Sequence, residues 1–230
     1  MRKSGSFVFI FFIAIMLLSA FQSGRFANPA QWLQHTLIML PAIVIGITLH
    51  EFAHAYAAWK LGDKTPQKQG RITLNPLAHI DPIGLITLIF VGFGWGRPVQ
   101  VNPYAFKGNR RAASLIVNVA GVITNFIVAF LCTATLFFVR DPILFMVLYN
   151  IVAINLMLMI FNLLPVPPLD GFGIITELFD LRRFSWYAPL YNNGTFILLA
   201  LIIFGITGML LGPAMGSLLT SFQKFWAMIL

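Results

Sequence analysis

Residues 36–59 read TLIMLPAIVIGITLHEFAHAYAAW, an apolar segment long enough to cross a bilayer, with the motif His-Glu-Phe-Ala-His near its end. On a helix, His50 and His54 are four residues apart and lie on one face, where they can bind one zinc ion together. Glu51 lies beside them and can act as a general base. Such polar groups are costly in hydrocarbon unless they have a function, so the segment predicts a zinc protease site inside a membrane.

Two other interpretations of the motif stay open. A solvated helix face is excluded by the apolar residues on both sides, but a buried structural His-Glu-His cluster is not. A transporter or channel that binds zinc without proteolysis is a rival from another functional class. Glu51 separates these alternatives, because a transport site has no need for a glutamate that is not a ligand.

The composition is that of a membrane protein, because 59% of the 230 residues are hydrophobic and only 10% are charged. We expect one integral-membrane domain over 1–230, with a first span and outer loop in 1–31, a catalytic core in 32–180 and C-terminal helices in 181–230. The net charge is +8, but the cations lie between apolar segments, so no nucleic-acid partner is expected. Cys132 is the only cysteine and therefore forms no disulfide within the chain.

The apolar segments predict a multi-pass α-helical protein in the lipid bilayer with about six transmembrane helices, which we place at 6–22, 33–60, 112–139, 143–164, 194–211 and 213–230. The segment 6–22 is alternatively a signal peptide. Gly212 and Pro213 divide the last two segments, which are alternatively one long kinked element. Lys and Arg are concentrated in alternate loops, so the positive-inside rule places both termini in the cytoplasm. The zinc site then lies near the cytoplasmic side.

Residues 70–103 do not fit a simple span. The apolar stretch 83–95 is too short to cross a bilayer, and the alternating polar and apolar residues of 71–74 and 98–101 are typical of short strands. We therefore expect a re-entrant or interfacial hairpin with a small membrane-associated β-sheet beside the active site. The edge of that sheet can bind an extended substrate by strand addition.

A catalytic zinc needs a third protein ligand, and acidic residues are few. Asp170 follows the predicted span 143–164 and the prolines of PVPPLDG, residues 165–171, which must interrupt a helix there. Irregular backbone at membrane depth is tolerated beside a cavity, which favours Asp170 as the ligand. Glu177 is the competing ligand, and Asp170 alternatively caps a short helix at 171–180.

The paired motifs HEFAH at 50–54 and PVPPLDG at 165–171 resemble those of the site-2 protease family of intramembrane zinc metalloproteases. RITLNPLAHIDPIG at 71–84, GWGRPVQVNP at 94–103 and GVITN at 121–125 also resemble bacterial members of that family. The resemblance covers about residues 36–180, and the chain shows no insert long enough for a PDZ or CBS domain.

This resemblance implies one Zn²⁺ per chain bound by His50, His54 and Asp170, with Glu51 as general base and Asn125 near the scissile carbonyl. The implied activity is cleavage of transmembrane segments near the cytoplasmic side of the bacterial inner membrane. The implied partners are a membrane-protein substrate and a regulatory membrane protein or a second copy of the chain.

Other polar residues in the spans have simpler explanations. Asn118 and Asn155 are expected to link helices, Asn125 and Asn162 to do either that or contribute to the site, and His79 to brace the hairpin rather than bind metal.

Overall fold

The computed structural model describes residues 27–91 and 94–230, together with positions 10, 13, 14, 17, 18, 21, 22 and 24. The predicted first span at 6–22, and the alternative of a signal peptide, fall largely outside these described residues, as does Gly92.

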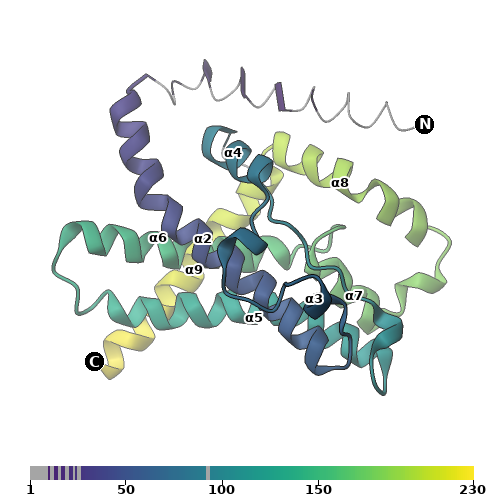
Figure 1. The fold of residues 1–230 in the computed structure, drawn as a ribbon. Helices are drawn as coiled ribbons and strands as arrows, with labels where there is room; N and C mark the ends of the chain where they lie inside the picture. Colours follow the sequence, from purple (N-terminus) through teal and green to yellow (C-terminus); the bar gives the residue numbers. More distant parts are fainter. Residues whose placement is uncertain are drawn as a thin grey trace.

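Three long helices form the centre of the protein (Figure 1). They are α2 (Pro29–Lys60), α5 (Arg110–Thr135) and α6 (Pro142–Asn162), and each is long and apolar enough to cross a membrane. Their bounds agree closely with the predicted segments 33–60, 112–139 and 143–164. One buried apolar cluster joins α5 and α6 and a second joins α2 and α5. These contacts hold the three helices as one bundle.

The starts of these helices follow from capping chemistry. The side-chain oxygen of Asn28 accepts from the N–H of Gln31 at 3.2 Å, and that of Asp141 accepts from Leu144 N at 2.8 Å. A proline follows each of these caps, where its missing N–H has no cost. Asn109 caps α5 in the same way, accepting from the first N–H groups of that helix.

The C-terminal region is one bent pair of helices, not the two predicted spans. It consists of α8 (Tyr187–Ile203) and α9 (Ile206–Ile229), bent by 73°. The break falls at Gly205, which has a φ of 72° that favours glycine, and Pro213 lies inside α9. The prediction of a division at Gly212-Pro213 was therefore wrong. Among the described residues, three helices can span a membrane, or four if the bent pair counts as one span, rather than six.

The end of α9 lies beside the C-terminal half of α5, because Trp226 Nε1 donates to the carbonyl of Phe130 at 2.8 Å (Figure 1). That end of the bundle is opposite the ends marked by Lys60 and Arg110. The cytoplasmic location of both termini, which the loop charges predict, stays a prediction.

The region 61–109 crosses the face of the bundle in short elements: α3 (Thr65–Lys68), η1 (Pro76–Ala78), α4 (Pro82–Val91) and η2 (Pro103–Ala105). The predicted sheet with strands at 71–74 and 98–101 is not present in the described part of the chain. A single antiparallel bridge joins Ile80 to Gly96 there. The prediction of a small β-sheet was therefore wrong.

Hydrogen bonds from side chains, rather than pairing between strands, fix the conformation of this region. The buried guanidinium of Arg71 donates to the carbonyls of Ala78, Arg97 and Pro98 and so ties the two flanks together. His79 is fully buried and its Nε2 donates to Thr73 O at 2.8 Å, so this residue braces the loop as predicted. Arg71 and His79 thus supply side-chain donors to backbone carbonyls of this irregular region, where no strand ladder pairs them.

Asp63 connects this region to the end of α2. Its carboxylate is fully buried and accepts from Thr65 N at 2.8 Å and from Asn102 N at 2.7 Å. Hydrogen bonds to a charged acceptor are among the stronger ones in proteins. The loop that ends at Asn102 is therefore held close to the C-terminal end of α2. The loop charges predict that this end faces the cytoplasm.

Candidate metal centre

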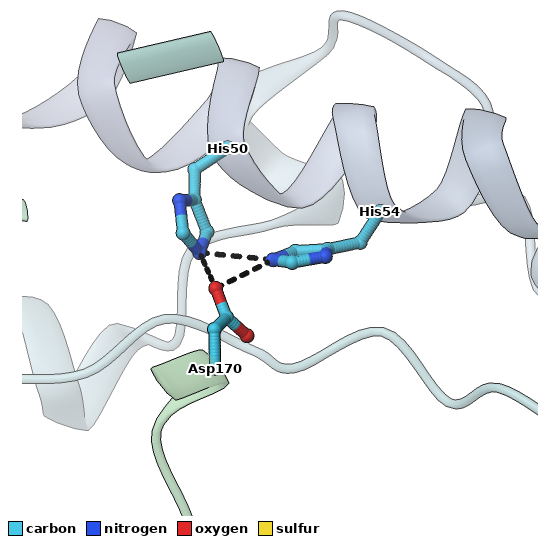
Figure 2. A group of neighbouring side chains, drawn as sticks. All are labelled: His50, His54 and Asp170. Atoms are coloured by element: carbon cyan, nitrogen blue, oxygen red, sulfur yellow. Dashed lines mark hydrogen bonds and ion pairs between the residues drawn. The ribbon is translucent and has the colours of Figure 1, made fainter. Parts of the chain in front are cut away.

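Three side chains from two distant segments converge at one point (Figure 2). His50 Nε2 lies 3.0 Å from His54 Nε2, and Asp170 Oδ2 lies 3.3 Å from the first and 3.2 Å from the second. All three ligand atoms lie within 4.8 Å of one another. Two imidazole nitrogens and a carboxylate oxygen are ligands that zinc prefers, with the fourth position left for water.

The hydrogen bonding of His54 leaves its Nε2 free to bind a metal. His54 Nδ1 lies 2.7 Å from the carbonyl oxygen of Val117 on α5. A carbonyl only accepts, so Nδ1 carries the proton, and in the neutral imidazole Nε2 then presents its lone pair. In metal-binding histidines, a hydrogen bond from the ring nitrogen that does not bind the metal fixes the tautomer and the ring orientation. The donor set and its support therefore fit zinc.

A glycine on α5 makes room for the two imidazoles. A Cβ atom at Gly121 would lie 2.6 Å from His50 Cε1 and 2.7 Å from His50 Nδ1, closer than Cβ atoms approach other atoms. The helix α5 thus packs directly against the rings, and only glycine fits at this position. The G-x-x-x-N pattern at 121–125 contains this residue, but the sequence alone did not show why its glycine is needed.

Asp170 reaches the histidines because the chain reverses after α6. The prolines at 165, 167 and 168 follow the end of that helix, and Asp170 is the first residue of α7 (Asp170–Phe179). Leu169 is the N-cap of α7, so Asp170 is not the cap residue. A Cβ at Gly171 would lie 2.6 Å from the carbonyl oxygen of Leu164, so glycine permits this tight return.

Glu177, the alternative third ligand, is engaged elsewhere. Its carboxylate is buried and accepts two hydrogen bonds from Arg182, at 3.0 and 2.5 Å. These bonds raise the pKa of the Arg182 guanidinium above its usual value. The Glu177 carboxylate is therefore not one of the three converging groups, and its charge is already balanced.

The converging groups open into a cavity of about 650 Å³. Glu51 lines it beside the two histidines, and Glu51 Oε2 accepts from the backbone N–H of Val99 at 3.0 Å. The segment around Val99 therefore forms one wall. The backbone N–H of Val99 was not identified from the sequence, because no side-chain pattern marks it.

The asparagines of α5 and α6 occupy different places. Asn118 and Asn162 line the cavity, whereas Asn125 and Asn155 are fully buried and do not. Asn125 is therefore placed behind the ligands and not on the cavity wall. Asn118 was expected only to link helices, although its position three residues before Gly121 puts it on the same helix face.

Known proteins resemble this chain over most of its length. It is 36% identical over 213 residues to the Bacillus subtilis protein named "Putative zinc metalloprotease YwhC", covering 86% of this chain and 97% of that protein. It is 28% identical to the Mycolicibacterium smegmatis protein named "Putative zinc metalloprotease Rip2", covering 76% of this chain and 70% of the relative. The Mycobacterium tuberculosis protein of the same name is 31% identical, covering 68% of this chain and 62% of the relative.

No family model matches the chain, and no solved structure matches it significantly. Because the 36% identity extends over 97% of YwhC, the chain belongs to the YwhC family of zinc metalloproteases.

Proposed function

We propose that this metalloprotease is an intramembrane endopeptidase that cleaves transmembrane segments of membrane proteins near the cytoplasmic side. The observation that carries the proposal is that Asp170 of α7 converges with His50 and His54 of α2, a helix of membrane-spanning length and hydropathy. A site built on such a helix gives a hydrophobic substrate direct access from the bilayer. Charged groups inside a span are costly and mark functional sites.

The position of the site along α2 supports a cut near one membrane surface. Lys60, at the end of α2, lies six residues after His54, which corresponds to about 9 Å along a helix. Its ammonium lies 5.3 Å from the ring centre of Tyr56 and 5.0 Å from that of Trp59. Aromatic residues next to a lysine are typical of the membrane–water interface. The ligands therefore lie just below that interface.

The residues of the site divide the chemistry between them. His50, His54 and Asp170 would hold the zinc ion, which when bound activates water and polarises a peptide carbonyl. Glu51 receives the proton of the attacking water and delivers it to the leaving amine as the peptide bond breaks. The N–H of Val99 orients the Glu51 carboxylate for both transfers.

A substrate helix must unwind before its peptide bonds can reach Glu51. The segment 98–102 belongs to no helix or strand and lines the cavity with Pro98, Val99 and Val101, so its free backbone groups can pair with an extended substrate. This replaces the predicted sheet edge as the surface for strand addition. We also propose that the protein lies in the bacterial inner membrane. A membrane partner or a second copy of the chain would regulate its activity there.

Replacing Val99 with Pro should lower cleavage about tenfold while leaving zinc bound. The change removes the backbone N–H that donates to Glu51, and a hydrogen bond to a charged group is worth about 1.5–3 kcal/mol. Turnover and zinc content of the purified variant check this. Val99→Ala, which keeps the backbone N–H, is the matched control, and equal turnover of the two variants would show that the Val99 N–H has no role.

The function itself is tested in liposomes that contain the protein and a panel of tagged single-span membrane proteins. Mass spectrometry of the products locates each cut, with Glu51→Gln as the inactive control. We expect cuts within the apolar segment, toward its cytoplasmic end. Cuts confined to soluble loops would contradict intramembrane cleavage, and zinc flux without cleavage would favour the transporter alternative.

A further inference from the structure

His50 and His54 differ in the support of their second ring nitrogen. His54 Nδ1 donates to a carbonyl, whereas His50 Nδ1 is buried and has no hydrogen-bond partner among the described residues. When Nε2 of His50 binds a metal, its Nδ1 carries a proton and needs an acceptor. Metal-binding histidines almost always have such an acceptor, so the structure should contain a residue that supplies it.

Asn125 on α5 has the required groups. Its side chain is fully buried, and both its Oδ1 and its Nδ2 lack a hydrogen-bond partner. It does not line the cavity, so its amide is not presented to a substrate there. A buried amide without partners is costly, and each such group needs an explanation.

The packing of α2 against α5 places Asn125 one helical turn beyond the contact between Gly121 and His50. The two helices run in opposite directions, with His54 against Val117 and with His50 and His54 against Gly121. On α5, Asn125 lies one turn after Gly121 on the same face. On α2, which runs in the opposite direction, the corresponding position is one turn before His50, at Gly46. Asn125 is therefore level with Gly46, in the layer next to the His50 ring.

Asn155 of α6 belongs to the same layer. A Cβ at Gly46 would lie 3.6 Å from Asn155 Nδ2. Asn155 is fully buried, and its Nδ2 donates to Ile151 O at 2.8 Å while its Oδ1 has no partner. The layer thus contains one N–H donor on His50 and two free amide oxygens, on Asn125 and Asn155.

We propose that Asn125 is a positioning residue for the zinc ligand His50. One buried water accepts the Nδ1–H of His50 and donates to Oδ1 of Asn125 and to Oδ1 of Asn155. A buried water typically makes about three hydrogen bonds to groups that otherwise lack partners. Asn125 thereby acts on the metal through His50, and not on the scissile carbonyl as the family resemblance implies.

The test is the zinc dissociation constant of the purified full chain, measured by competition with a chelator. We expect Asn125→Leu to weaken zinc binding about 10- to 100-fold, as loss of such outer partners does. Asn155→Leu should give a smaller weakening. Asn150→Leu is the matched control, because this asparagine of α6 only donates to Met146 O, and its zinc binding should equal that of the wild type.

Two further measurements separate positioning from folding. The thermal midpoint of Asn125→Leu without metal should stay near that of the wild type, because the lost amide makes no hydrogen bond to another described residue. Asn125→Ala adds no atoms and therefore controls for steric overlap of the leucine. It should weaken zinc binding as much as Asn125→Leu does.

The inference rests on the proposed zinc site, and the two fail differently. A wild type that binds no zinc contradicts the site itself. A wild type that binds zinc, with both Asn125 variants binding it equally well, contradicts only this inference. Unchanged zinc binding with a lower turnover number would return Asn125 to a role in substrate binding.

Discussion

The Glu51→Gln variant is expected to lose about 100- to 10,000-fold in cleavage rate and to bind zinc as the wild type does. Glu51 lines the cavity beside the ligands but is not one of the three converging groups, so its replacement leaves the metal site complete. A glutamine keeps the size of the side chain and its carbonyl oxygen can still accept from Val99 N. The amide cannot take or return a proton, so only the proton transfers are lost.

Turnover of a membrane-protein substrate and zinc content, measured on the same preparation, check this prediction. Retention of more than about one tenth of the wild-type rate would assign the general base to another group. Loss of zinc from Glu51→Gln would instead make Glu51 a ligand. Either result requires a different division of roles among the residues of the motif.

The second large effect is expected at Gly121, where Ala should abolish zinc binding and cleavage together. The new methyl group overlaps the rings of both histidines, and those rings cannot move without leaving the positions that face Asp170. We expect zinc affinity to fall by more than the roughly 100-fold seen for outer-partner losses, because the ligands themselves are displaced. Alanine is a better helix former than glycine, so α5 itself should not be weakened.

Gly208→Ala is the matched control, because a Cβ at Gly208 in α9 meets no atom within 4 Å. This variant should bind zinc and cleave substrate as the wild type does. Normal zinc binding by Gly121→Ala would show that α5 and the two histidines are further apart than in the structure. Circular dichroism of both variants checks that helix content is unchanged.

The central helices were predictable from local sequence properties. Residues 36–59 are apolar over more than the thickness of a bilayer, and Asn28-Pro29 and Asp141-Pro142 mark helix starts by capping chemistry. The pairing of His50 with His54 follows from helix geometry alone. These features depend on residues close in sequence, which is why they could be read without the structure.

The region 70–103 and the C-terminal helices were not predictable in the same way. The flanks at 71–74 and 98–101 have a strand-like pattern, but the side chain of Arg71 satisfies the backbone carbonyls that a sheet would pair. Pro213 was taken as a helix boundary, yet α9 continues through it and the break falls at Gly205. In the first case long-range contacts override a local pattern, whereas in the second a glycine with a positive φ interrupts the helix.

The site was predictable in part. The structure brings Asp170 to the histidines and pairs Glu177 with Arg182, a distinction that spacing along the chain did not settle. The backbone N–H of Val99 and the burial of Asn125 behind the ligands depend on packing between distant segments. Sequence motifs identify residue types, whereas the direction in which each side chain faces comes only from the fold.

The most direct test of the account is the zinc content of the detergent-purified protein, comparing wild type, Asp170→Ala and Glu177→Ala. We expect about one zinc per wild-type chain, a clear loss in Asp170→Ala and full retention in Glu177→Ala. Zinc-free wild-type protein that is folded, full zinc in Asp170→Ala, or loss of zinc only in Glu177→Ala would contradict the site formed by His50, His54 and Asp170.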